Sequence, residues 1–402
     1  MEKKVESFFS EKVSIFVLLL VSTLTIIFAS KIYTYEAILS LQDASNYISL
    51  AENPINYFTV PHQDALRILP SIFIYLLKFS GLSTDNCFKF LTFILFIYLH
   101  LKTFFLLKTY GIKNYLALST IAILFYSSHS VIYTVFNYYQ LLDLLTYILI
   151  IYFFQLNKKH NLKILFFVSL ISIFTKEYLL ILVCATYLKY FINYKKMNIV
   201  LSLLFILLIF TIHYKLASSH NLDLKAESNI IFMINSFFGS LDLFIKSIID
   251  ALIVERNIFL FMPFSLLILS RSFIKILINN YAIVLFAIVP LGFSILLFQN
   301  VGNNFFRVFY HGYFIILLLS ILFLNKIIIN DEISKILFFI SPTFFIIDFI
   351  FILQNINQDG FFYFFQETRY NYFSGYFIFN LIIIFIILKN FRNIFLKIQK
   401  VI

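Results

Sequence analysis

Ionisable side chains gather in the segment 42–70, which lies between two strongly apolar stretches of the chain. Asp43, His62, Asp64 and Arg67 all fall within it. A carboxylate can take the proton of an attacking hydroxyl group, and a cationic side chain can stabilise a departing phosphate. Because ionisable groups held beside a membrane are costly and usually functional, we expect the chemistry of the protein in this segment.

Composition determines the class of protein that carries these groups. The 402 residues are 61% hydrophobic and only 13% charged, with a mean hydropathy of +0.92. A water-soluble core could not bury so much apolar surface. The sequence therefore predicts an all-α, polytopic transmembrane protein that forms a single integral membrane domain over 1–402.

Neither metal nor cofactor binding is indicated. Cys87 and Cys184 fit no disulfide framework and no metal spacing, and the seven histidines never take HxxxH spacing, although His129 and His311 fall toward span ends. The net charge of +11 is scattered over short loops. This distribution favours orientation in a membrane over nucleic-acid binding.

Apolar runs predict roughly twelve membrane spans, each near the length that crosses a bilayer. The expected spans are 13–30, 87–108, 114–131, 136–156, 162–175, 178–193, 197–216, 256–270, 276–298, 306–325, 335–354 and 373–389.

Lysine and arginine near the span ends set the orientation. Placing the basic loops in the cytoplasm puts both termini there, and a bacterial inner membrane is the simplest location. The alternation requires that 66–80 does not cross but lies at the outer interface, with Pro70 in or near its first turn. The long first extracytoplasmic loop is then 31–86. A second extracytoplasmic segment, 217–255, carries an amphipathic helix over 230–254.

This topology places the remaining polar segments on the same outer side as the first loop. They are 127–130 with Asn137 and Gln140, 175–177, 220–227, 303–307 and 359–369. Since only the basic loops were used to assign the sides, this convergence independently indicates one outward-facing site.

The layout resembles the glycosyltransferase-C superfamily, whose polytopic members move a sugar from a polyprenyl-phosphate donor at the outer leaflet. Three short motifs carry the resemblance: 42–47 (QDASNY), 67–70 (RILP) and 175–177 (TKE). A later segment, 303–307 (NNFFR), is similar to the Asp/Asn-rich stretch followed by Arg in bacterial members. The loop lacks a tight acidic pair around Asp43, so metal-assisted chemistry is not implied.

The resemblance implies an inverting, base-assisted transfer to an extracytoplasmic acceptor, which is a cell-envelope glycan, a lipid or a protein. Asp43 is the expected base, with Asp64 as the second candidate. Arg67, Lys176 and Arg307 are expected to bind the donor phosphate. Supporting roles in the same site are expected for three further residues: Tyr47, His62 and Glu177.

Structural alternatives remain for several of these residues. Asp43 could cap a helix that begins near Ala44, Arg67 could anchor an interfacial helix to headgroups, and Lys176 with Glu177 could form a local ion pair. A stripe of aromatic residues at 361–365 is more typical of an interfacial belt than of a sugar platform.

Two other functions also remain open. A secondary transporter or a flippase of lipid-linked saccharides would place charges near the bilayer midplane and often shows two similar halves, whereas this chain shows no half-repeat. An O-antigen-type polymerase relies on large late outer loops with arginines. The late loop 355–372 is short, and Arg369 is its only arginine.

Overall fold

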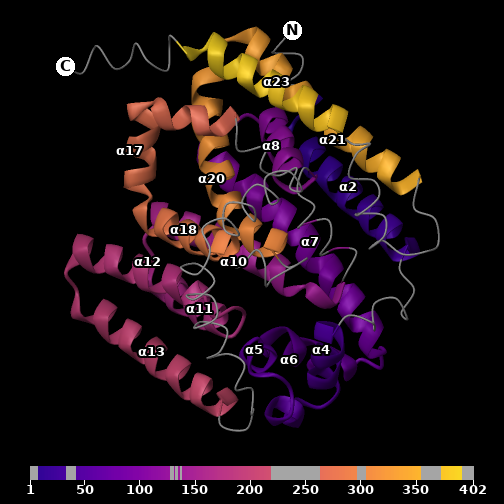
Figure 1. The fold of residues 1–402 in the computed structure, drawn as a ribbon, viewed down its shortest axis with the longest axis vertical. Helices are drawn as coiled ribbons and strands as arrows, with labels where there is room; N and C mark the ends of the chain where they lie inside the picture. The colour runs from indigo at the N-terminus through magenta and orange to yellow at the C-terminus, as the bar shows by residue number, and fades with distance from the viewer. Residues whose placement is uncertain are drawn as a thin grey trace, which may run out of the picture.

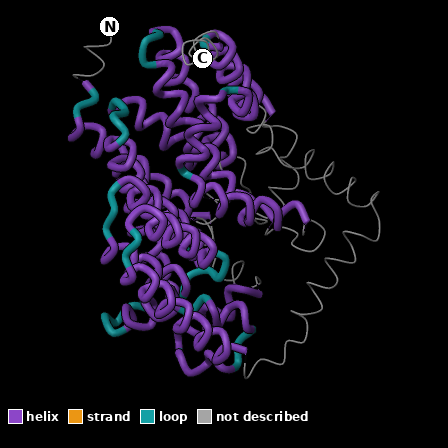
Figure 2. The backbone as a smooth tube through the Cα atoms, turned by 90° about the vertical axis from the view of Figure 1, so that its left-hand side faces the viewer, coloured by secondary structure: helices purple, strands orange, loops and turns teal. Residues whose placement is uncertain are grey.

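The computed structural model describes residues 8–32, 42–126, 131, 135, 138–218, 263–296, 305–354 and 373–391. These residues form helices joined by short loops, with no strand among them (Figure 2). The prediction of an all-α protein is thus confirmed.

The described helices are, in chain order, α2 (Glu11–Ile32), α4 (Gln42–Glu52), α5 (His62–Leu66), α6 (Leu69–Lys78), α7 (Thr84–Thr109), α8 (Asn114–Tyr126), α10 (Leu142–Lys158), α11 (Leu162–Ile173), α12 (Leu179–Tyr194), α13 (Met197–Ser218), α17 (Arg271–Asn279), α18 (Tyr281–Leu296), α20 (Phe305–Ile328), α21 (Glu332–Gln354) and α23 (Phe373–Lys389). Three short 3-10 turns are η1 (Pro54–Phe58), η2 (Tyr138–Gln140) and η3 (Leu266–Leu269).

Helices α4, α5 and α6 gather at one end of the bundle, at the bottom of Figure 1 and far from α21 and α23. We call this the loop end. Local sequence explains its short helices: Asn53 accepts a hydrogen bond from the backbone of Ile55 and so caps η1, and Pro54 follows at a position that lacks a helical donor bond anyway. Pro70 lies in the first turn of α6, as expected.

Among the described residues, three helices are long and apolar enough to cross a membrane: Thr84–Thr109, Met197–Ser218 and the part Tyr310–Ile328 of α20. Five shorter apolar helices accompany them within the described ranges. Helix α6 has 10 residues, or roughly 15 Å of length, which is half of a hydrocarbon core about 30 Å thick. Its length agrees with an interfacial position, and the full set of about twelve spans stays a prediction.

The expected span 276–298 is wrong as a continuous helix. Helix α17 ends at Asn279 and α18 begins at Tyr281, with a bend of 94° between them. The side chain of Asn280 donates to the carbonyl oxygen of Ile276 at 2.8 Å and accepts from Asn157 at 2.5 Å. The break is therefore fixed by amide hydrogen bonds, and α17 with α18 could at most count as one bent span.

The other expected elements of this region are only partly covered. Only 263–270 of the expected span 256–270 is described, and there an α-helical stretch at 263–265 is followed by the 3-10 turn η3. The proposed amphipathic helix 230–254 and most of the segment 217–255 lie outside the described residues.

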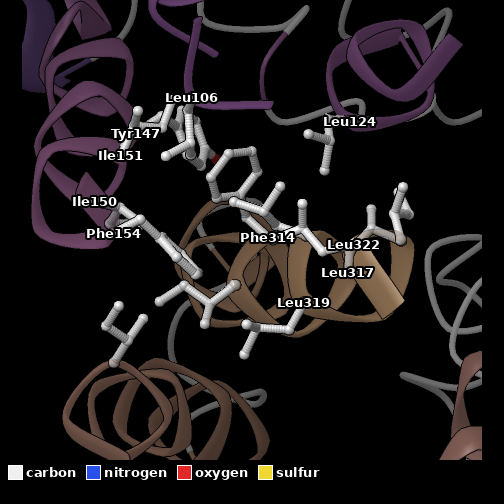
Figure 3. Close-up of a cluster of buried hydrophobic side chains, with 14 of the residues drawn as sticks. Leu106, Leu124, Tyr147, Ile150, Ile151, Phe154, Phe314, Leu317, Leu319 and Leu322 are labelled. Carbon is white, nitrogen blue, oxygen red and sulfur yellow. The ribbon is translucent and has the colours of Figure 1, made fainter. Parts of the chain in front are cut away.

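The main core lies between α7, α8, α10 and α20. Its fully buried side chains include Leu106, Leu124, Ile150 and Phe314, which converge in Figure 3. Helix α20 is central to the bundle, because 83% of its apolar stretch is buried. Only 17% of the apolar stretch of α13 is buried. The exposed face of α13 is apolar, as expected of a surface that contacts lipid.

The apolar face of α13 includes Leu201, Leu204, Phe205, Leu208 and Ile212. A face of this kind would be unfavourable in water. Together with the three long apolar helices, it indicates a membrane protein.

Candidate functional site at the loop end

A bidentate ion pair joins the first loop to the turn between α11 and α12. Arg67 donates from Nε to Oε2 of Glu177 at 3.1 Å and from Nη2 to Oε1 at 2.6 Å. The backbone N–H of Leu69 donates to the carbonyl oxygen of Phe174 at 3.3 Å beside it. Two motifs that are far apart in the sequence, 67–70 and 175–177, are thus in direct contact.

Both members of this pair stay charged over a wide pH range. Burial would raise the pKa of Glu177, but the attraction and hydrogen bonds of Arg67 outweigh burial and lower it. Burial would lower the pKa of Arg67, but Glu177, and to a smaller extent Tyr47, raise it well above its usual value. The side chain of Arg67 remains 19% exposed and that of Glu177 remains 30% exposed, so other ligands can reach them.

The first loop is also fastened to the end of α13 through His213. The ring Nε2 lies 3.1 Å from the carbonyl oxygen of Leu66, which can only accept, so Nε2 carries the proton. The Tyr57 hydroxyl lies 3.1 Å from both Nδ1 and the backbone carbonyl oxygen of His213 and shares its single proton between these two acceptors. Burial raises the pKa of Tyr57 to about 12, which keeps that hydroxyl a donor at neutral pH.

Two expected site residues lie close to this fastening point. The ring of His62 packs edge-on against Tyr214 with centroids 4.8 Å apart. Tyr47 is buried, and its carbonyl oxygen accepts from the hydroxyl of Ser71 in α6 at 3.3 Å.

The two candidate bases belong to neighbouring short helices. Asp64 in α5 is buried and accepts from the side-chain amide of Asn46 in α4 at 2.7 Å. Asp43 lies in the first turn of α4, three residues before Asn46, and its side chain lies outside the described part. The Asn46–Asp64 hydrogen bond thus joins α4, the helix that carries Asp43, to α5.

The capping alternative for Asp43 is not tested, because the described part of α4 begins at Gln42 and the Asp43 side chain lies outside the described part.

Lys176 points into the bundle and belongs to a buried charge cluster that we define as Asp143, Lys176 and His311. The Lys176 ammonium pairs with Oδ1 of Asp143, and Nε2 of His311 lies 3.4 Å from the same oxygen. The Tyr178 hydroxyl lies 2.7 Å from Nδ1 of His311. The three members of the cluster come from α10, the α11–α12 turn and α20.

Lys176 and Glu177 have different ion-pair partners on different sides of the turn. Lys176 contacts Asp143 inside the bundle, and Glu177 contacts Arg67 at the loop. Lys176 is the smallest of the causes that lower the pKa of Glu177, so Arg67 is the main partner of that carboxylate.

Sequence reasoning missed Asp143 altogether and considered His311 only as a metal ligand. The signal was present, since Asp143 interrupts the apolar run LLDLL at 141–145. A carboxylate within an apolar segment is expected to face a partner inside the bundle. No rule on spacing could have identified that partner as Lys176, because the contact depends on how α10 packs against the turn.

Other parts of the expected site are not tested. Arg307 lies in the first turn of α20, one turn before His311, and its side chain lies outside the described part. The polar segments 127–130, 220–227 and 359–369 are also outside it, as are Asn303 and Asn304.

Within the described ranges, no three His, Cys, Asp or Glu side chains are grouped so that they could hold a metal ion. No protein-family model, curated protein or solved structure matches the chain. The fold and its apolar helices define the class as an all-helical membrane protein with an ionisable site at one end of the bundle.

Proposed function

We propose that the protein is a membrane glycosyltransferase that moves a sugar from a polyprenyl-phosphate donor to an extracytoplasmic acceptor by inverting, base-assisted transfer. The observation that carries this proposal is the contact between Arg67 and Glu177, which brings two of the three motifs of the resemblance together. The third motif, in α4, packs against α5 and α6 at the same end.

The geometry gives Arg67 a suitable role at the phosphate. Glu177 takes the donors on the Nε and Nη2 edge of the guanidinium. A guanidinium has five N–H donors in a fixed fork, and Glu177 and Tyr47 together do not use all of them, so a remaining donor can meet a phosphate oxygen. Glu177 orients the group, and Arg67 stabilises the charge that develops on the departing polyprenyl phosphate.

The acceptor requires a carboxylate. Its hydroxyl oxygen attacks the anomeric carbon while the carboxylate takes the hydroxyl proton, and the bond from that carbon to the phosphate oxygen breaks. Asp43 is the first candidate for this base. Asp64 is the second, because the Asn46 amide already occupies one of its carboxylate oxygens.

Lys176 has a less direct place in this scheme than the sequence suggests. Its ammonium is buried and paired with Asp143. A phosphate oxygen would reach it only from within the bundle, so Arg67 is the main cation at the loop and Arg307 is the second expected one.

The experiment that tests the proposal follows a radiolabelled sugar on a polyprenyl-phosphate donor in membranes that contain the protein. We expect protein-dependent loss of label from the donor and release of polyprenyl phosphate, both abolished in Arg67→Ala. The matched control is Lys389→Ala, which removes a cation that is paired with Asp331 far from the loop end. Wild-type protein that leaves every polyprenyl-phosphate donor intact would remove the transferase proposal.

A second candidate is a transporter or flippase of lipid-linked saccharides. Two observations favour it: the 94° bend between α17 and α18 and the buried charge cluster, since transporters use interrupted helices and ionisable groups inside the bundle. Proteoliposomes with a labelled lipid-linked saccharide separate the two functions. A transporter moves the intact lipid between leaflets, whereas a transferase cleaves it.

A further inference from the structure

Three consecutive residues of the α11–α12 turn point to different partners. Lys176 pairs with Asp143, Tyr178 bonds to His311, and Glu177 between them pairs with Arg67. The residues on both sides of Glu177 are therefore tied into the bundle, while Glu177 itself faces the first loop.

The backbone of the turn transmits these ties to Glu177. The N–H of Lys176 donates to the carbonyl oxygen of Ser172 at 3.1 Å, and the N–H groups of Leu179 and Leu180 donate to the carbonyl oxygens of Lys176 and Glu177 at 3.0 and 3.1 Å. These bonds hold the backbone of the turn together, so a shift of the backbone at Lys176 or Tyr178 would also shift it at Glu177. The position of Glu177 thus depends on where Lys176 and Tyr178 are held.

Asp143 is the acceptor at the centre of this arrangement. It is fully buried in the first turn of α10, and its Oδ1 faces both Lys176 and His311. A buried carboxylate and a buried ammonium keep their charges only when they are paired. The pair therefore fixes Lys176 in the bundle more firmly than apolar packing alone would.

We infer that Asp143 is a positioning residue for the anion site at Arg67: it holds the α11–α12 turn so that Glu177 presents the guanidinium of Arg67 to a lipid-linked phosphate. This inference rests on the proposed function, because it takes Arg67 to bind the donor phosphate. Asp143 acts through the turn and does not touch the donor.

The competing explanation is that Asp143 only balances the charge of Lys176. The double variant Asp143→Asn with Lys176→Met separates the two, because it removes both charges and leaves neither one buried without a partner. If charge balance is the whole role, the double variant regains both thermal stability and phosphate binding. If Asp143 positions the turn, it regains stability relative to Asp143→Asn while phosphate binding stays weak.

The binding experiment uses the full-length protein in nanodiscs, with a sugar-free polyprenyl phosphate as the probe and the corresponding polyprenyl alcohol as the reference lipid. The difference between the two isolates the contribution of the phosphate. We expect Asp143→Asn and the double variant to weaken the phosphate-dependent part of binding by about tenfold or more. The control is Asp331→Asn with Lys389→Met, which removes an ion pair between the residue that precedes α21 and the end of α23 and leaves binding unchanged.

Tyr178→Phe is a milder variant that keeps every charge and is expected to fold. It removes the hydroxyl bonded to His311, and we expect it to weaken phosphate-dependent binding in the same direction. Wild-type-like binding by both Asp143→Asn and Tyr178→Phe overturns the inference, as does recovery of binding in the double variant. A wild-type protein that does not prefer the phosphate over the alcohol also overturns it.

Failure of the proposed function gives a different result. A protein that binds polyprenyl phosphate through Arg67 and loses this binding in Asp143→Asn, but never transfers a sugar, supports the positioning role and excludes the transferase.

Discussion

Arg67 and Glu177 are 110 residues apart in the sequence and form a two-point ion pair between the first loop and the α11–α12 turn. The pairing uses a guanidinium edge that a lysine does not have. It fixes both the distance and the plane of the Arg67 side chain. A merely interfacial arginine that snorkels toward headgroups would not need such a fixed orientation.

The pH dependence of stability follows from this pair. The pKa of Glu177 is lowered in the folded protein from its usual 4.5. A lowered carboxyl pKa stabilises the fold above the unfolded-state value, and this contribution is lost as the pH falls below that value. We therefore expect the melting temperature of the wild type to fall more steeply than that of Glu177→Gln on acidification below about pH 4.5.

Melting curves of the detergent-solubilised protein between neutral and acidic pH measure this difference. The raised pKa of Arg67 lies above the accessible range, so Arg67 adds no titration of its own. Parallel curves for the wild type and Glu177→Gln would show that the pair contributes nothing to stability.

Gly312 predicts a separate packing effect in the centre of the bundle. A Cβ at this position would lie 2.4 Å from the carbonyl oxygen of Ala287 and 2.8 Å from the Leu291 side chain. Gly312→Ala must push α20 away from α18, at a cost of about 1–3 kcal/mol for overpacking. Because His311 is the adjacent residue, the same change should disturb the buried charge cluster.

Gly292→Ala in α18 is the matched control, because nothing lies within 4 Å of a Cβ built there. Its thermal stability should equal or exceed that of the wild type, since alanine favours a helix more than glycine does. Equal melting temperatures for both variants would contradict the close approach of α18 and α20.

Much of the fold could be predicted from hydropathy, and the reasons for the exceptions are local. The runs 87–108 and 197–216 correspond to α7 and α13, because a long uninterrupted apolar stretch has few alternatives to a helix. The run 276–298 is interrupted at Asn280, where the helix bends. The side-chain amide of Asn280 forms hydrogen bonds to Asn157 and to the Ile276 backbone, which favour a break that an average over hydropathy does not detect.

The site was predictable in part for a similar reason. Arg67 and Glu177 are polar residues at the ends of apolar runs, and the alternation of basic loops placed them on one side. Asp143 and His311 were not recognised, since a single ionisable residue within an apolar helix gives no indication of its partner. Their contact depends on the packing of α10 and α20, which only the structure defines.

Removal of basicity at the candidate bases tests the chemistry. Asp43→Asn keeps the size of the side chain, and we expect it to lower donor turnover by about 10²–10⁴-fold with little loss of expression. Asp64→Asn should have a smaller effect if Asp43 is the base. The measurement is sugar transfer by matched amounts of each variant in membranes, with Asp331→Asn as the distant control.

The opposite order of effects would assign the base to Asp64. In that case the Asn46 amide, which donates to its carboxylate, becomes the group that orients it, and Asn46→Ala should reproduce part of the loss. Near wild-type turnover in both Asp variants would remove the loop carboxylates from the mechanism.

Topology is the prediction on which the outward-facing site depends. Cysteines at Ser80 and Lys159 report on it well, because both side chains are exposed, and neither position provides the N-cap hydrogen bond that Ser83 and Asn161 provide for α7 and α11. In a background of Cys87→Ala and Cys184→Ala, we expect an impermeant maleimide to label Ser80→Cys on intact cells. Lys159→Cys should react only after the membrane is opened, because the basic loops face the cytoplasm. The reverse pattern would mean that the chain has the opposite orientation in the membrane, and the contact between Arg67 and Glu177 would then lie at the cytoplasmic surface, which no lipid-linked donor of the outer leaflet can reach.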